Sequence, residues 1–279
     1  MSDTPLLSVS DLKVRFHLRH GTVEAVRGVS FDLGRERLGI VGESGSGKSQ
    51  TGRAILGLTP PPGEVTAEAL SFDGTNLLTA SRKELRHLRG SRMTMVMQDP
   101  KYSLNPVMTV GRQMAEAYRA HVRSSRREAH DKALAMLEAV RLRRPDRVLG
   151  LYPHELSGGM GQRVMIAMML ITDPDLLIAD EPTSALDVTV QLEILRILDD
   201  LVGRRGMGLI FISHDLELVS SFCDRVLVMY AGRVMEELRA EDLGRAQHPY
   251  TQGLMRCLPK LDDDLHPLPT LERDPAWAS

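Results

Sequence analysis

The stretch GESGSGKS, at Gly42–Ser49, decides the fold of this chain. It matches the pattern GxxxxGK[ST], and the apolar run 38–41 that precedes it is typical of a buried strand. A helix is predicted to follow, from Lys48 towards Leu58. Glycines let such a loop curl so that its backbone N–H groups converge on phosphate oxygens, and the helix N-terminus adds its positive dipole end. The stretch therefore predicts a phosphate-binding loop between a strand and a helix, against the alternative of a chance glycine-rich turn.

Each side chain of the loop has an expected part in binding MgATP. Lys48 is expected to neutralise the β- and γ-phosphates, and the Ser49 hydroxyl is expected to ligate Mg²⁺. The predicted nucleotide contacts in this stretch are Gly42, Glu43, Ser44, Gly45, Ser46, Gly47, Lys48, Ser49 and Gln50.

The pattern on either side of the loop predicts an α/β fold. The first thirty-odd residues alternate as strands do, whereas apolar residues recur at helical spacing from Val110 to about Val140. Buried strands are expected at 176–179 and 209–213, with an amphipathic helix between them. We expect a P-loop NTPase core with a mostly parallel sheet, an N-terminal antiparallel β subdomain, an inserted α-helical subdomain and a short C-terminal extension. The predicted limits are 1–243 for the nucleotide-binding domain, about 99–165 for its helical part and 244–279 for the extension.

Composition argues against a nucleic-acid-binding protein and against a membrane-spanning protein. The formal net charge is −2, from 35 basic and 37 acidic residues, so no positive field predicts a nucleic-acid partner. The longest apolar runs fall far short of the roughly 20 residues that span a bilayer. No signal peptide is apparent at the N-terminus, and a cytoplasmic protein is expected. Any role at a membrane would then come through a partner.

Charged residues also follow the two later strands. Asp180 and Glu181 close the run LLIADE, at the strand end where α/β sheets build ligand sites. Asp180 is suited to hold Mg²⁺ through water, and Glu181 is suited to polarise an attacking water. His214 follows the next strand, where it would contact the γ-phosphate and assist catalysis. The alternatives are a strand end capped by solvated charge and a histidine that caps a helix.

The stretch Leu156–Met160, LSGGM, resembles the signature motif of the ATP-binding cassette (ABC) ATPases. Ser157, Gly158 and Gly159 are expected to open a helix at Gln162–Ile171, whose free N–H groups form a second anion site. Two such sites in one chain fit a head-to-tail pair, in which each signature caps the nucleotide held by the other chain.

Other elements of the family follow in order, and their roles are implied by the resemblance. Gln98 resembles the glutamine that senses the γ-phosphate and Mg²⁺, and Asp187, in SALD, resembles the loop through which the paired chains communicate. His214 corresponds to the switch histidine. Phe16 stands where the adenine-stacking aromatic stands, although a core or edge-strand role fits its pattern nearly as well.

A narrower likeness concerns the cargo. The stretches Gln98–Pro106 and His248–Thr251 look like the ATPases of bacterial oligopeptide, dipeptide and nickel importers. That likeness implies two membrane permeases, a second and non-identical ATPase, and an extracytoplasmic binding protein, with this chain at the cytoplasmic face of the inner membrane. Peptide import is the first expectation, a nickel or other small-solute importer is the alternative, and a non-transport ABC ATPase is a further one.

Two departures from the family pattern have consequences. Gly161 stands where a charged or polar residue is usual, and it is expected to loosen the start of the signature helix. Cys257 alone cannot supply the four thiolates of an iron–sulfur cluster, so no cluster is expected. A kinase or a GTPase built on the same loop is disfavoured, because no Asn-Lys-x-Asp element is present and LSGGM would be unexplained.

Overall fold

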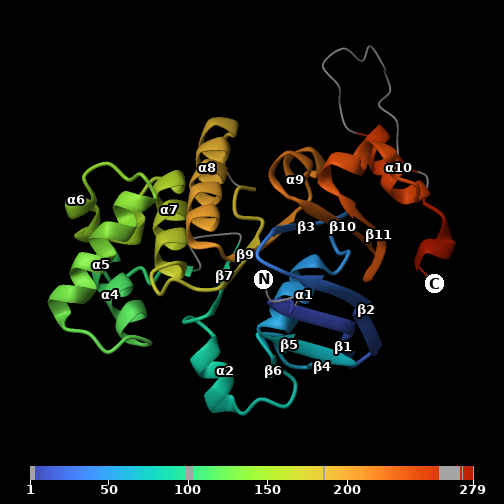
Figure 1. Ribbon diagram of the computed structural model, residues 1–279, viewed down its shortest axis with the longest axis horizontal. Helices are drawn as coiled ribbons and strands as arrows, with labels where there is room; N and C mark the ends of the chain where they lie inside the picture. Colours follow the sequence, from blue (N-terminus) through green and yellow to red (C-terminus); the bar gives the residue numbers. More distant parts are fainter. Residues whose placement is uncertain (1–3, 98–102, 185, 258–270, 272, 279) are drawn as a thin grey trace. The chain divides into compact units, whose positions relative to one another are not determined.

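The computed structural model describes residues 4–97, 103–184, 186–257, 271 and 273–278. The chain forms two compact units. Residues Met1–Ala80 and Ile210–Ser279 make the first unit, and Ser81–Leu209 make the second. Figure 1 follows the chain in colour from one end to the other. The predicted limits of the nucleotide-binding domain, helical part and extension stay predictions.

An antiparallel sheet occupies the N-terminal part of the first unit (Figure 1). β1 pairs with β2 along most of its length and with β4 and β5 on its other side. Alternate residues of β1, including Leu7, Val9, Leu12 and Val14, are buried, as the strand pattern predicted. The strands are β1 (Leu7–Leu18), β2 (Gly21–Leu33), β4 (Gly63–Thr66), β5 (Ala69–Phe72) and β6 (Thr75–Asn76).

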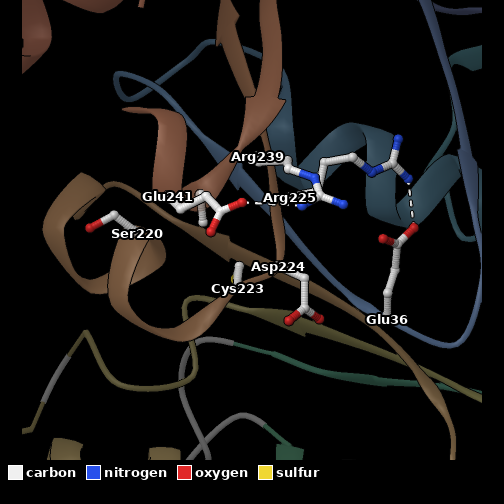
Figure 2. Close-up of a pocket in the computed structure, with 8 residues that line it drawn as sticks. Glu36, Ser220, Cys223, Asp224, Arg225, Arg239 and Glu241 are labelled. Atoms are coloured by element: carbon white, nitrogen blue, oxygen red, sulfur yellow. Dashed lines mark hydrogen bonds and ion pairs between the residues drawn. The ribbon is translucent and has the colours of Figure 1, made fainter. Parts of the chain in front are cut away.

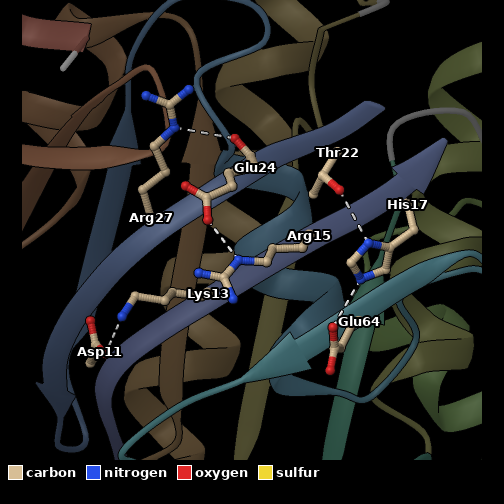
Figure 3. A network of polar contacts seen from close by, with 8 residues as sticks. All are labelled: Asp11, Lys13, Arg15, His17, Thr22, Glu24, Arg27 and Glu64. Atoms are coloured by element: carbon tan, nitrogen blue, oxygen red, sulfur yellow. Dashed lines mark hydrogen bonds and ion pairs between the residues drawn. The ribbon is translucent and has the colours of Figure 1, made fainter. Parts of the chain in front are cut away.

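The other face of this sheet carries paired charges, which Figure 3 shows. Arg15 Nε lies 2.6 Å from Glu24 Oε1, and this hydrogen bond lowers the pKa of the Glu24 carboxyl. His17 Nε2 lies 2.9 Å from Glu64 Oε2, which joins β1 to β4. Exposed pairs of this kind contribute little to stability, because water and salt screen the charges. Their place on the solvent side keeps the apolar side for the core.

The second sheet of this unit carries the loop of interest. Its strands follow the order β11-β10-β3-β9, with β10 parallel to β3 and antiparallel to β11. β9 begins in the second unit, and its residues from Ile210 on belong here. The elements are β3 (Arg37–Val41), α1 (Lys48–Ile55), β9 (Gly208–Ser213), α9 (Leu216–Phe222), β10 (Arg225–Tyr230), β11 (Arg233–Arg239), α10 (Pro249–Arg256) and the 3₁₀ turns η2 (Ala240–Arg245) and η3 (Pro275–Ala278).

The second unit is mainly helical around one parallel strand pair, β7 and β8. Ser81 and Ser125 begin α2 and α5 with capping boxes, each formed with a glutamate three residues on. The predicted helical pattern is confirmed as two helices, α4 and α5. The elements are α2 (Arg82–Leu88), β7 (Met93–Val96), α4 (Val110–Arg119), α5 (Arg126–Ala139), α6 (Pro145–Leu149), η1 (Pro153–Glu155), α7 (Gly158–Met169), β8 (Leu176–Asp180) and α8 (Val188–Arg205).

The predicted fold class, α/β with an antiparallel and a parallel sheet, is confirmed by these strand pairings. β8 and β9 are buried along their whole length, as their apolar runs predicted. Among the described residues, no helix is both long and apolar enough to span a bilayer.

Candidate active site

The glycine-rich loop joins the end of β3 to the start of α1, as predicted. Gly47 has a φ of +99°, and a Cβ there would lie 2.4 Å from the backbone oxygen of Ala25. A Cβ at Gly42 would lie 2.0 Å from the backbone oxygen of Met229. Both neighbours are backbone and cannot move aside, so any larger side chain would displace the loop. Gly45 has a φ of +81° and no atom near its Cβ position, which leaves the crest of the loop open.

Lys48 lies buried inside the loop. Its Nζ donates to the carbonyl oxygens of Gly42 and Glu43 at 2.7 and 2.8 Å, and to Ser46 Oγ at 3.4 Å. Lys48 is also the first residue of α1, whose N-cap is Gly47. Because Gly47 supplies no side-chain hydrogen bond, the first turn of α1 is open to an anion. The loop thus combines a fixed cation with a helix N-terminus.

Polar side chains beside Lys48 complete this part of the site. Ser44 is exposed and Ser46 is buried, whereas Ser49 and Gln50 in α1 are half-buried. Gln50 Oε1 is buried and has no hydrogen-bond partner in the part of the chain that the structure describes.

His214 and the loop face one cavity in the first unit. This cavity, of about 190 Å³, is lined by Val41, Gly42, Glu43, His214, Leu216, Leu254 and Cys257. His214 follows β9 directly and is exposed. The first unit therefore brings the predicted switch histidine to the loop. Phe16 is half-buried in β1, opposite Val23 of β2 and Gly63 of β4, and its stacking on adenine stays a prediction.

The two predicted carboxylates end β8 in the second unit. Asp180 is the last residue of the strand and is buried, and Glu181 is half-buried. Glu181 has a φ of +46°, in the left-handed region that residues other than glycine seldom adopt. Such strained residues cluster at functional sites. The sequence offered no signal for this conformation.

The signature stretch forms a helix start, but the predicted helix limits are wrong. Helix α7 begins at Gly158 and ends at Met169, whereas Gln162–Ile171 was expected. The start is earlier because Ser157 is the N-cap: its Oγ accepts from Met160 N at 3.4 Å, and its carbonyl accepts from Gly161 N at 2.8 Å. Gly161 is buried within the helix, and the expected loosening of the helix start stays a prediction.

A cavity of about 570 Å³ lies beside this helix start. It is lined by Arg141, Leu142, Arg143, Ser157, Gly158, Gly159, Met160, Arg163, Leu186, Asp187, Val190 and Glu193. Asp187 caps α8, because its Oδ1 accepts from Val190 N at 3.0 Å. Arg163 forms an ion pair with Glu193. The predicted signature residues and Asp187 therefore share one surface of the second unit. Gln98 lies outside the described residues.

Another cavity of about 570 Å³, in the first unit, holds none of the predicted site residues (Figure 2). Arg225, on its wall, bonds with Glu36 at 2.7 Å and also pairs with Glu237. Burial raises the pKa of the Cys223 thiol to about 12, so the thiol stays protonated at neutral pH. The ion pairs of Arg225 and the protonated thiol of Cys223 fit a structural role for this cavity.

Sequence reasoning missed two contacts of the loop. Tyr250 Oη accepts from Glu43 N at 3.4 Å, and Arg273 pairs with the Glu43 carboxylate at 3.1 Å. Tyr250 belongs to the stretch HPYT, which pointed only to the identity of the cargo. Nothing in the linear pattern shows that a residue more than 200 positions away returns to the loop.

Comparison with known proteins identifies relatives over most of the chain. Residues 26–184 match the ABC transporter family. A probable peptide ABC transporter ATP-binding protein of Sinorhizobium fredii is 52% identical over 257 residues, which are 91% of this chain and 77% of the relative. The dipeptide transport ATP-binding protein of Haemophilus influenzae is 46% identical over 96% of this chain and 82% of its own length. The oligopeptide transport ATP-binding protein of Escherichia coli is also 46% identical, over 97% and 80% respectively.

Solved structures show the same fold. The dimeric post-hydrolysis state of an ATP-binding cassette bound to ADP and phosphate has a TM-score of 0.74 and 27% identity, over 84% of this chain and 98% of its own. CbiO1 of Clostridium perfringens, part of the ABC transporter complex cbiONQ, has a TM-score of 0.73 and 26% identity, over 91% and 96% respectively.

Proposed function

Because the chain belongs to the ABC transporter family, we propose that it is the ATP-hydrolysing subunit of a peptide importer. ATP binding and hydrolysis come with the family. The observation that carries the proposal is the loop at Gly42–Ser49, with its buried lysine and its open helix start. The names of the relatives, which transport peptides, dipeptides and oligopeptides, support the cargo.

The residues of the first unit bind the triphosphate in this proposal. Lys48 already points into the loop, where its charge would move from loop carbonyls to phosphate oxygens. The open first turn of α1 supplies N–H groups to the same anion. His214, across the shared cavity from Glu43, would contact the γ-phosphate.

Mg²⁺ is proposed from the type of donor that each unit offers. Ser49 offers a hydroxyl and Asp180 a carboxylate, and both are the hard oxygen ligands that Mg²⁺ prefers. Gln98 is proposed as a further ligand on the resemblance alone. Bound there, Mg²⁺ would neutralise charge on the phosphates. Glu181, which has a left-handed backbone conformation directly after β8, would accept a proton from the attacking water.

Pairing follows from the second anion site. Ser157 uses an oxygen lone pair for the cap and keeps its hydroxyl proton for another acceptor. That proton and the glycine N–H groups would hold the γ-phosphate bound by a second subunit, with Asp187 at the same surface. The cassette solved as a dimer with ADP and phosphate supports this arrangement. A second ATPase subunit, two permeases and an extracytoplasmic binding protein would complete the transporter at the cytoplasmic face of the inner membrane.

Replacing the general base tests the proposal. Glu181→Gln is expected to lower ATP turnover about 10²–10⁴-fold, because proton transfer to a positioned base contributes that much. The variant should still bind ATP and should form stable pairs, which size-exclusion chromatography with ATP would detect. Glu138→Gln, an exposed carboxylate of the same unit, is the matched control. Normal turnover in Glu181→Gln would show that Glu181 is not the base.

The cargo needs a separate test. Cells that lack this gene are expected to lose uptake of a labelled tripeptide and to recover it with the wild-type gene but not with the Glu181→Gln form. Loss of nickel uptake with normal peptide uptake would contradict peptide import while leaving the ATPase assignment intact.

A further inference from the structure

The phosphate loop is held by residues from the C-terminal part of the chain. Glu43, the second residue of the loop, donates its backbone N–H to Tyr250 Oη at 3.4 Å. Its carboxylate accepts from Arg273 Nη2 at 3.1 Å and Nε at 3.2 Å. All three residues belong to the first unit. One loop residue is therefore held through its main chain and its side chain at once.

Tyr250 reaches the loop from a rigid support. The carboxylate of Glu236, in β11, accepts from Gln247 N at 2.7 Å and from His248 N at 3.2 Å. His248 then caps α10, because its Nδ1 accepts from Tyr250 N at 3.1 Å. These bonds fix the first turn of α10, and with it the direction of the Tyr250 side chain.

Aromatic packing fixes the ring itself. Tyr250 is fully buried, with its ring centroid 4.7 Å from that of Tyr230 and 5.8 Å from that of Trp277. A buried ring among aromatic neighbours has little rotational freedom. Burial also raises the pKa of the Tyr250 phenol to about 12, so the hydroxyl stays neutral at physiological pH. The hydroxyl is thus a fixed acceptor at the edge of the loop.

Glu43 lies at the point where such an acceptor matters. Its carbonyl oxygen accepts from Lys48 Nζ at 2.8 Å. Because Lys48 would move to the phosphates in the proposed function, the bond from Glu43 N to Tyr250 Oη is the one of these two that stays when ATP binds. The preceding Gly42 has no room for a side chain, which leaves the backbone path there little freedom. A shift at Glu43 would therefore pass to the following N–H groups, which bind phosphate in the proposed function.

We propose that Tyr250 is a positioning residue for ATP: its hydroxyl fixes the Glu43 amide and so holds the phosphate loop in its binding shape. The inference rests on the proposed function, because it concerns binding of ATP at that loop. Arg273 has a smaller part, because its ion pair with Glu43 is partly exposed, with 57% of the arginine side chain accessible.

The test removes one oxygen atom. Tyr250→Phe keeps the ring and loses the hydroxyl, and in the full-length chain it should raise the KM for ATP about 2–5-fold, towards the low end of the loss expected for one hydrogen bond because the bond is 3.4 Å long. The kcat should stay within about twofold, because the bond is present before and during the reaction. Equilibrium ATP binding should weaken by the same factor as KM rises.

Tyr230→Phe is the matched control. It removes a hydroxyl from the same aromatic cluster, at a residue for which the described structure gives no hydrogen bond to the loop. Its KM is expected to equal that of the wild type, and Arg273→Met should raise KM less than Tyr250→Phe does. The inference is overturned if Tyr250→Phe binds ATP as the wild type does, or if Tyr230→Phe weakens binding equally. A wild-type chain that neither binds nor hydrolyses ATP would instead overturn the proposed function.

Discussion

Each unit of this protein presents a glycine-rich helix start, and the two are built differently. In the first unit, α1 begins after Gly47, which supplies no side-chain cap, and a buried lysine fills the loop before it. In the second unit, α7 begins after Ser157, whose hydroxyl caps the first turn. The loop at α1 encloses an anion with a cation and backbone, whereas the start of α7 offers only its dipole, N–H groups and one hydroxyl. We infer that the first binds a nucleotide alone and that the second completes a site already occupied.

Removing the charge of Lys48 is expected to have the largest effect on the difference between the two helix starts. Lys48→Ala is expected to weaken ATP binding by the single chain at least about 10–100-fold, because hydrogen bonds to charged groups are worth about 1.5–3 kcal/mol. It also leaves the Gly42 and Glu43 carbonyls without their donor. Isothermal titration of ATP into the full-length chain measures the loss. Ser157→Ala should bind ATP as the wild type does, and weakened binding there would contradict the division of roles.

The glycines of the two helix starts should respond oppositely to a methyl group. Gly47→Ala requires a left-handed alanine whose Cβ would meet a backbone oxygen at 2.4 Å, so we expect more than about 2 kcal/mol of destabilisation and lost ATP binding. At Gly159 the φ is ordinary and the Cβ would meet a side-chain atom, Val190 Cγ1, at 2.8 Å, so we expect a smaller loss of stability than at Gly47.

Gly159→Ala should therefore be destabilised less than Gly47→Ala, bind ATP as a single chain and lose ATPase activity in the paired state, where the methyl group would cover the N–H groups. Denaturant unfolding and ATPase assays separate the two variants. Equal unfolding free energies for Gly47→Ala and the wild type would contradict the claim that the loop requires glycine at position 47.

The two helix starts also differ in how well they could be predicted from the sequence. The first helix start was predicted correctly to begin at Lys48, because eight positions of one pattern determine its geometry. The start of α7 was placed four residues too late, at Gln162 instead of Gly158. The three glycines at positions 158, 159 and 161 lower helix propensity, and the capping hydrogen bond of Ser157 outweighs them. Helix propensity alone therefore could not predict the residue at which α7 begins.

Long-range contacts were beyond the sequence pattern for another reason. Tyr250 and Arg273 meet Glu43 across more than 200 residues, and no periodicity or spacing encodes such a return. The left-handed Glu181 was also unforeseen, because its conformation is imposed by the chain around it and not by its own preference. The chemistry of both carboxylates could be predicted, since it depends on residue type and on the end of a strand.

Removing the cap at α7 is expected to have an intermediate effect. Ser157→Ala should cost about 0.5–2 kcal/mol of stability, towards the low end because the hydrogen bond is 3.4 Å long. ATPase activity of the paired form should fall about tenfold, because a hydrogen bond to charged phosphate is lost. Ser157→Thr, which keeps the hydroxyl, should restore most of the activity. Activity lost equally in the threonine variant would indicate a steric role instead.

A pH titration is expected to show the smallest effect on stability. The first unit should lose stability at high pH, and the second unit should lose stability at low pH. In the first unit, burial raises the pKa of Cys223 from 9.0 to about 12, so the folded chain holds this proton more tightly than the unfolded chain. Its stabilisation is complete below pH 9 and is lost as the pH rises from 9 towards 12. In the second unit, burial lowers the pKa of His121, which instead reduces stability as the pH falls below 6.5. Fluorescence of Trp277 reports unfolding of the first unit, and far-ultraviolet circular dichroism reports the loss of helices in both units, most of which lie in the second. Cys223→Ala should flatten the alkaline slope seen by Trp277, whereas Cys257→Ala should leave it unchanged. An alkaline slope that persists in Cys223→Ala would mean that another group of the first unit releases the proton.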